Sequence, residues 1–406
     1  MKICQINCVY GEGSTGKIVR DIHNCLMSEN VDSIVIVPMV SRVFSDDKGV
    51  FAVSNKYLSM LSAFLRRVTG RQFDGAYFQT NRILRILKTE KPDIVHLHCI
   101  NGNNINVYRL YEYLAKNKIK TVLSLHAEFP YTGGCGHAYD CTKWKSGCYH
   151  CPILKEATQS FVFDGTKHTW ARLKECYQLF DDRLLYITAV SPWLIMRARQ
   201  SPMLYRFNMT TVMNGVDTRV FRRYKNTNWR ETLGIKNGEK ILFHVTANFC
   251  PNTDNLKGGK YILEIAKQLK FDNLKIVVAA NYAKIENLPA NVIFIGRTKN
   301  QQMLAELYSE ADLTIITSKR ETFSMPVAES LCCGTPVVGF NAGGPESIAM
   351  DEYCSFVDYG NVGELVNVVK MFLKNQYNKS EISNEATLIY DRDIMTSNYI
   401  NIYKSL

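Results

Sequence analysis

Two glutamates eight residues apart, Glu321 and Glu329, lie in a stretch whose residue types could act on a sugar or bind a phosphate. Paired carboxylates can work as an acid and a base, or they can accept hydrogen bonds from sugar hydroxyls. Pro326, between them, suits the first turn of a helix, where free backbone N–H groups attract anions. The stretch therefore predicts either a catalytic carboxylate pair or a site for a ligand with hydroxyl and phosphate groups.

The elements that must position this pair can be read from the flanking residues. Residues 311–317 form a short apolar, β-branched run of the kind that makes a buried strand, and residues 337–340 form another. The sequence Gly-Thr-Pro at 334–336 ends the helix between them. Glu321 is thus expected on the loop after a strand and Glu329 early in a helix. Because helical side chains lean toward the helix N-terminus, both carboxylates can face one crevice.

The segment from Glu321 to Glu329, followed by residues 334–338 and 343–346, resembles the donor site of the group 1 (family 4) retaining glycosyltransferases. Further matching segments occur in the family's order along the chain, at residues 13–16, 93–98, 126, 214–217, 257–258 and 308–312. The resemblance implies a GT-B fold and the transfer of a sugar from a UDP- or GDP-sugar to an acceptor hydroxyl, with the anomeric configuration retained. It also implies that catalysis needs no metal cofactor.

The resemblance assigns most of the donor-binding roles to the second half of the chain. It implies that Glu329 binds the ribose hydroxyls and that Lys257 balances the charge of the diphosphate. Glu321 would hold the donor sugar as a catalytic residue. The backbone of three residues would help to hold the same sugar, and these are Phe323, Ser324 and Met325.

Three further assignments complete the predicted site, and two of them, His126 and Arg297, involve departures from the family pattern. His126, the second catalytic candidate, would face the sugar from the other domain, although Ala127 stands where relatives usually have Asp. Gly16 lies in a Gly-rich turn that would let a diphosphate or the acceptor approach the backbone. The turn resembles a Walker A loop, but Ile18 stands where such a loop needs a hydroxyl for Mg²⁺, which argues against an ATPase. Arg297 is a candidate phosphate contact, replacing an arginine that many relatives carry upstream of the lysine.

Short apolar strands alternate with helical stretches from one end of the chain to the other. This alternation predicts an α/β protein with two Rossmann-like, doubly wound parallel sheets facing across a cleft. The first domain is expected at residues 1–217, with a Cys-rich insertion at about 130–155. The donor domain is expected at 218–388, and a C-terminal helix at 389–406 would cross back to the first domain.

Four cysteines lie within seventeen residues, with one pair at the Cys-x2-Cys spacing. Such a set suits a structural zinc site with four thiolate ligands, and it is equally consistent with reduced thiols packed in a loop. The four residues are Cys135, Cys141, Cys148 and Cys151. The chain has thirteen cysteines, an odd number that favours reduced thiols and a cytoplasmic location over a disulfide framework.

The net charge of +11 suits an anionic membrane, a phosphorylated substrate or nucleic acid. Residues 57–68 have apolar side chains at helical spacing beside Arg66, Arg67 and Arg71. This pattern is typical of a basic amphipathic helix that rests on the inner face of the cell membrane, and also of a helix that packs its apolar face on its own domain. No apolar run is long enough to span a membrane.

Two other functions compete with a glycosyltransferase. A glycoside hydrolase would use Glu321 and Glu329 as its acid and its nucleophile or base. A basic, zinc-containing protein that binds nucleic acid would explain the charge and the cysteines, but the chain has no recognition helix or aromatic RNA-binding strand. We therefore predict a nucleotide sugar as the donor and no nucleic-acid partner. The predicted acceptor is a saccharide or a lipid-linked saccharide of surface polysaccharide synthesis (capsule or O-antigen).

Overall fold

The computed structural model describes residues 1–252, 255–270, 273–283 and 285–406, and this chain divides into two units. The first unit is Met1–Met213 with Thr396–Leu406, and the second is Asn214–Met395. The division thus falls at Met213 rather than at 217, and the return to the first unit begins at residue 396 rather than 389. The last helix, α15 (Arg392–Ser405), contributes most of its length to the first unit.

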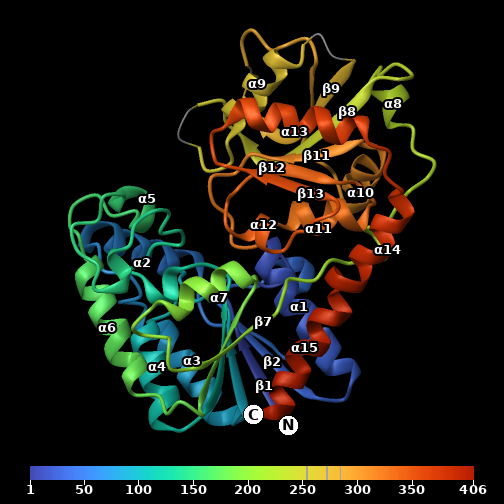
Figure 1. Cartoon of the computed structure of the whole chain (residues 1–406). Coiled ribbons are helices and arrows are strands. Elements are labelled where there is room, and N and C mark those ends of the chain that lie inside the picture. The colour runs from blue at the N-terminus through green and yellow to red at the C-terminus, as the bar shows by residue number, and fades with distance from the viewer. Residues whose placement is uncertain (253–254, 271–272, 284) are drawn as a thin grey trace. The chain divides into compact units, whose positions relative to one another are not determined.

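The first unit is built on a seven-stranded parallel sheet in the order β3-β2-β1-β4-β5-β6-β7, with helices on both faces (Figure 1). Its strands are β1 (Lys2–Ile6), β2 (Asp32–Val37), β3 (Val50–Ala52), β4 (Ile94–Leu97), β5 (Lys120–Leu125), β6 (Leu185–Ala189) and β7 (Asn208–Thr211). Its helices before the return are α1 (Gly13–Ser28), α2 (Lys56–Thr69), α3 (Tyr77–Glu90), α4 (Val107–Lys116), α5 (Leu154–Thr158), α6 (Thr166–Gln178) and α7 (Pro192–Arg199).

The second unit has a six-stranded parallel sheet in the order β10-β9-β8-β11-β12-β13. Its strands are β8 (Lys240–Phe249), β9 (Leu274–Tyr282), β10 (Val292–Gly296), β11 (Leu313–Ile316), β12 (Val337–Phe340) and β13 (Cys354–Val357). Its helices are α8 (Trp229–Thr232), α9 (Gly259–Gln268), α10 (Gln301–Glu310), α11 (Met325–Cys332), α12 (Gly344–Ser347), α13 (Val362–Lys374) and α14 (Lys379–Tyr390). Strands β11 and β12 are buried along their whole length because helices cover both faces of the sheet (Figure 1).

The predicted fold class of two doubly wound parallel sheets is confirmed. Two strands have no clear signal in the sequence, and both are short: β3 has three residues and β13 has four. They lie at the ends of their sheets, where a strand has a single neighbour and needs no long apolar run.

The order of strands decides where a ligand can bind in each unit. In the second unit the chain moves outward from β8 to β9 and β10, and then crosses back to place β11 on the other side of β8. Open parallel sheets bind ligands at such a reversal, beyond the carboxyl ends of the strands. The segments that follow β8 and β11 are therefore neighbours, and they contain Lys257 and Glu321.

Candidate functional site

An ion pair joins the two segments at the reversal of the second sheet. The Nζ atom of Lys257 contacts Oε1 of Glu321, and the Ser318 hydroxyl donates to the same oxygen over 2.8 Å. Lys257 is held at its backbone as well, because its N–H donates to Asn255 and its carbonyl accepts from the Thr317 hydroxyl. The structure therefore brings together a cation and a carboxylate that are 64 positions apart in the sequence.

A glycine allows the Lys257 segment to run against the end of β11. Gly258 has φ of +65°, and a Cβ atom added there would lie 2.0 Å from the Thr317 carbonyl oxygen. No other residue type fits this position without moving one of the two segments. The pair Lys257-Gly258 is therefore a geometric unit, in which the glycine sets how closely the lysine approaches Glu321.

The Glu321 loop is fastened to the turn that precedes α12. The Glu321 N–H donates to the Ala342 carbonyl over 3.0 Å, and the Gly344 N–H donates to the Glu321 carbonyl over 2.9 Å. Glu346 closes the turn, since its two carboxylate oxygens accept from the N–H groups of Ala342 and Gly343. Glu346 therefore acts inside the protein as a helix cap, and the Gly-Gly-Pro-Glu sequence at 343–346 supports the donor loop.

The N-terminus of α11 has the features expected of an anion site. Ser324 precedes the helix in an unusual backbone conformation with φ of +88°, and its side chain caps no N–H group. Its hydroxyl is buried and has no hydrogen-bond partner among the described residues. Phe323 is buried beside it, whereas Met325 is half-buried. The N–H groups of the first helical turn thus point out of the helix without a side-chain cap, as a phosphate-binding terminus requires.

Glu329 lies in the second turn of α11, where Tyr308 from α10 contacts it. The Tyr308 hydroxyl donates to Glu329 Oε2 over 3.4 Å. Burial raises the pKa of Tyr308 well above its ordinary value, and the charge of Glu329 adds to the effect. Tyr308 therefore stays protonated and serves as a donor that orients the Glu329 carboxylate.

Two residues of this site were missed by sequence reasoning. Ser318 follows β11 directly, three residues before Glu321, and this spacing could have suggested a hydroxyl partner. His244 lies inside β8, and burial lowers its pKa to about 4, with Lys257 contributing. Its Nδ1 is 3.0 Å from the Ile315 carbonyl oxygen and donates to it, while its buried Nε2 has no hydrogen-bond partner among the described residues. From the sequence alone, a single histidine in an apolar strand does not indicate that it belongs to this site.

Arg297 is not part of this cluster. It follows β10 at the end of the sheet, two strands away from β8, and its side chain is exposed. Neighbouring strands are about 4.8 Å apart, so the end of β10 is roughly 10 Å from the end of β8. The role of Arg297 as a phosphate contact stays a prediction.

In the first unit, His126 follows β5 and completes a row of three buried histidines. His126 Nε2 lies 3.1 Å from His98 Nδ1, and His98 Nε2 lies 3.2 Å from the side-chain oxygen of Gln5. His96 is fixed by Ser124 and by Tyr403 of α15. Burial lowers the pKa of His126 to about 4 and the pKa values of His96 and His98 well below 6.5. All three rings are therefore neutral near pH 7.

The neighbours of a neutral ring decide which of its nitrogens carries the proton. The Gln5 oxygen can only accept, so His98 donates from Nε2 and accepts at Nδ1. His126 must then donate from Nε2 to His98, which leaves its Nδ1 as an acceptor. The buried row thus sets the tautomer of the predicted catalytic histidine.

Gly16 lies in the first turn of α1, after the Gly-rich loop that follows β1. The Gly11 N–H donates to the Gly16 carbonyl over 2.9 Å, and a Cβ atom on Gly16 would lie 3.2 Å from the Gly11 nitrogen. Glu12, which precedes the helix, caps no N–H group with its side chain. The loop is therefore closely folded on the start of α1, and the predicted contact of Gly16 with a ligand stays a prediction.

The Cys-rich insertion begins directly after His126 and is anchored by buried groups. The fully buried Glu128 accepts from Arg197 over 2.5 Å, from Tyr131 over 3.1 Å and from the Ala138 N–H over 2.6 Å. Trp144 packs inside the insertion, with its ring centroid 5.1 Å from that of Tyr131. The insertion is thus tied to α7 through one carboxylate.

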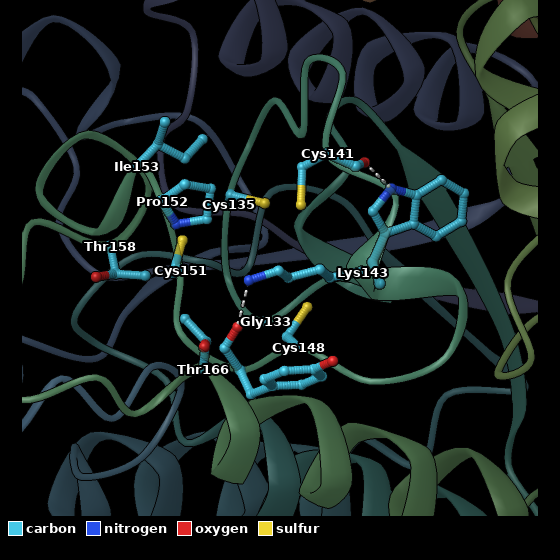
Figure 2. Close-up of a pocket in the computed structure, with 12 residues that line it drawn as sticks. Gly133, Cys135, Cys141, Lys143, Cys148, Cys151, Pro152, Ile153, Thr158 and Thr166 are labelled. Carbon is cyan, nitrogen blue, oxygen red and sulfur yellow. Dashed lines mark hydrogen bonds between the residues drawn. The ribbon is translucent and has the colours of Figure 1, made fainter.

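Figure 2 shows the four cysteines of the insertion around one pocket, with their sulfur atoms pointing into it. All four are free thiols, and Lys143 holds the loop between them by donating to the carbonyls of Tyr149 and His150. Burial raises the pKa values of Cys135 and Cys148 to about 12. In the described part of the chain, however, no three His, Cys, Asp or Glu side chains are arranged so that they could hold a metal ion. Structural zinc stays a prediction for these thiols.

Comparisons with known proteins bear on both units. Residues 225–388 match the model of the family described as glycosyl transferases group 1. The chain is 21% identical to the putative colanic acid biosynthesis glycosyl transferase WcaC of Escherichia coli K12, with 100% of both chains covered. It is 28% identical over 199 residues to the N-acetyl-alpha-D-glucosaminyl L-malate synthase of Bacillus anthracis, covering 47% of this chain and 50% of that protein.

Solved structures show the same architecture over the whole chain. The structure of Alr3699/HepE from Anabaena in complex with UDP-glucose has a TM-score of 0.66 at 15% identity and covers 100% of both chains. The fold is that of the GT-B glycosyltransferases. The family match over residues 225–388 supports glycosyltransferase activity. Within the second unit, residues 225–388 are similar to the group 1 glycosyl transferases.

Proposed function

We propose that this enzyme transfers a sugar from a UDP- or GDP-sugar to a hydroxyl group of its acceptor, with the anomeric configuration retained. The observation that carries the proposal is the Lys257–Glu321 ion pair beside the uncapped N-terminus of α11. A cation, free N–H groups and carboxylates in one place suit a ligand that has a diphosphate between two sugars. The UDP-glucose complex of the structurally similar HepE protein supports a nucleotide sugar as the ligand.

In the proposed site, each group meets the part of the donor that its chemistry suits. The ammonium group of Lys257 and the N–H groups at the start of α11 balance the diphosphate. Glu321 accepts from hydroxyls of the transferred sugar, helped by the backbone of residues 323–325. Glu329, oriented by Tyr308, accepts from the ribose hydroxyls.

The leaving group in this reaction is a nucleoside diphosphate, so negative charge develops on its phosphate as the glycosidic bond breaks. Preorganised positive charge stabilises that transition state without a metal ion. The catalytic role of His126 stays a prediction, and Nδ1 is the ring nitrogen that would accept a hydrogen bond in that role, because the Nε2 proton is committed to His98. Retention of configuration follows from the family resemblance, and the anomeric coupling constant of the product in a proton NMR spectrum tests it.

The acceptor in our proposal is a lipid-linked saccharide of surface polysaccharide synthesis, handled at the inner face of the cell membrane. The similarity to the putative colanic acid enzyme WcaC over the full length supports this choice. In the described part of the chain, no helix is long and apolar enough to cross a membrane. A hydrolase that used Glu321 as its acid is disfavoured, because Lys257 and Ser318 both donate to that carboxylate.

The test is a calorimetric titration with a panel of UDP- and GDP-sugars. We expect one donor to bind, and Glu329→Gln to weaken it about 10- to 100-fold, since a hydrogen bond to a charged group contributes ~1.5–3 kcal/mol. Glu264→Gln, on the exposed side of α9, is the matched control and should bind like the wild type. Undiminished donor affinity of Glu329→Gln would refute the ribose assignment, and release of sugar from a simple glycoside would favour a hydrolase.

A further inference from the structure

Helix α2 (Lys56–Thr69) is turned so that its large apolar side chains face away from the protein. Six of them lie at i, i+3, i+4, i+7, i+8 and i+11, which makes one stripe along the helix. Their exposed fractions run from 38 to 83%, and the six are Tyr57, Met60, Leu61, Phe64, Leu65 and Val68. A surface helix normally buries such a stripe against its own domain. None of the residues of α2 is buried.

The opposite side of α2 is small and polar, and this side holds the helix to its unit. The Ser59 hydroxyl donates to Asn104 over 2.6 Å. Arg66 donates to Gln72 over 3.2 Å and to Gln159 over 2.9 Å. With 3.6 residues per turn, Arg66 lies about 180° from the centre of the apolar stripe. The hydrogen bonds of the inner side thus fix the orientation of the outer one.

A second segment extends the apolar stripe. Phe161, Val162 and Phe163 follow α5 and are each about 60% exposed or more. The Phe161 N–H donates to the Arg67 carbonyl over 3.0 Å, so this segment lies against the C-terminal end of α2. Figure 1 shows α2 and α5 next to each other. The six stripe residues and residues 161–163 together form one surface, which we call the α2 patch.

Positive charge borders the α2 patch. Residues 56–71 contain four basic residues and no acidic one. Lys56 and Arg67 lie about 90° from the centre of the stripe, on the same side of the helix, and both are exposed, as is Arg71. This position lets cations lie in a layer of anionic headgroups while the apolar side chains enter the layer below.

We propose that the α2 patch is a docking surface for an anionic lipid bilayer. The exposed apolar stripe of α2, its aromatic residues and its one-sided basic border suit a bilayer interface, where aromatic rings and cations are favoured. The inference goes beyond the proposed transfer reaction, because it concerns binding without donor or acceptor.

The experiment is sedimentation of the full chain with vesicles of phosphatidylcholine, with and without phosphatidylglycerol. We expect binding only to the vesicles with phosphatidylglycerol, weakened by salt. Leu61→Ser with Phe64→Ser should weaken it at least about ten-fold, because two side chains that would enter the bilayer lose apolar area. Arg67→Gln should weaken it about five-fold, as expected for one juxtamembrane charge.

Matched controls lie outside the patch. Leu388→Ser on α14 and Arg183→Gln before β6 replace exposed residues of the same types and should bind like the wild type. Absence of vesicle binding by the wild type would overturn the proposal, and so would equal binding by the patch and control variants. Light scattering tests whether the α2 patch binds a second copy of the chain instead. If the wild type is a dimer that does not bind vesicles, and Leu61→Ser with Phe64→Ser dissociates it, the membrane proposal is overturned. Donor titration of the same variants tests the proposed function separately.

Discussion

Replacing Gly344 by alanine should displace the donor loop without removing any side chain that we propose to bind the donor. Gly344 begins α12, and its N–H donates to the Glu321 carbonyl. A Cβ atom added there would lie 2.5 Å from both the Phe323 nitrogen and the Thr322 carbonyl carbon. All of these neighbours are backbone atoms, so no flexible side chain can make room, and the loop itself must move.

The size of the effect follows from this geometry. An ordinary contact for a methyl group is about 3.5 Å, so the loop at Phe323 must shift by roughly 1 Å. A displacement of that size in an active site lowers the rate by up to about 100-fold. Overpacking also costs ~1–3 kcal/mol of stability, which lowers the melting temperature of a unit of this size by several degrees.

The assay compares kcat/KM for the donor and the melting temperature of wild type, Gly344→Ala and Gly363→Ala. Gly363 is the matched control: it lies in α13, and no atom comes within 4 Å of an added Cβ. We expect Gly363→Ala to keep its activity and to gain up to ~1 kcal/mol of stability, because alanine favours a helix. A folded Gly344→Ala protein with wild-type kcat/KM would show that the loop at 321–323 does not hold the donor.

The remaining predictions concern acid stability and the cysteines. Burial lowers the pKa values of His126 and His244 to about 4 in the folded chain. As the pH falls, the unfolded chain therefore takes up a proton on each of these rings before the folded chain does. The free energy of unfolding should therefore keep its full value above about pH 7 and fall by ~3 kcal/mol for each histidine between pH 6.5 and 4. Urea titrations that gave the same free energy of unfolding at pH 7 and pH 5 would contradict this. If the four thiols bind zinc, Cys148→Ser should lower both the metal content measured by mass spectrometry and the melting temperature, whereas Cys25→Ser on α1 should change neither. Stable wild-type protein without metal would refute the zinc prediction.

Much of the fold could be predicted because its signals are local. Buried parallel strands read as short apolar runs, and the helices between them read by their periodicity. The sequence also indicates that Glu321 follows a strand and that Glu329 lies in the helix after it, since Pro326 and Gly334 mark that helix on both sides. The order of strands in a sheet has no local signal. The neighbourhood of β8 and β11, and with it the Lys257–Glu321 pair, therefore required the structure.

Contacts between distant positions explain the other gaps in the candidate site. His96 lies in β4, His98 closely follows that strand, and His126 directly follows β5. They become a row only because β4 and β5 pair. The acceptor role of His126 Nδ1 depends on Gln5, in a third strand. Neither the row nor its proton arrangement can be derived from the spacing of histidines along the chain.

The orientation of α2 shows how two interpretations of one pattern can be separated. The periodicity of residues 57–68 predicts an apolar stripe, and a stripe is equally suited to a protein core and to a bilayer. The residues on the other side of the helix decide between them: Ser59 and Arg66 find partners inside the unit, so the polar side faces inward. A helix fixed by its polar side leaves about 100° of apolar surface exposed to water, which is unfavourable unless another apolar phase covers it. The basic border makes an anionic bilayer the covering that suits both the charge and the apolar area.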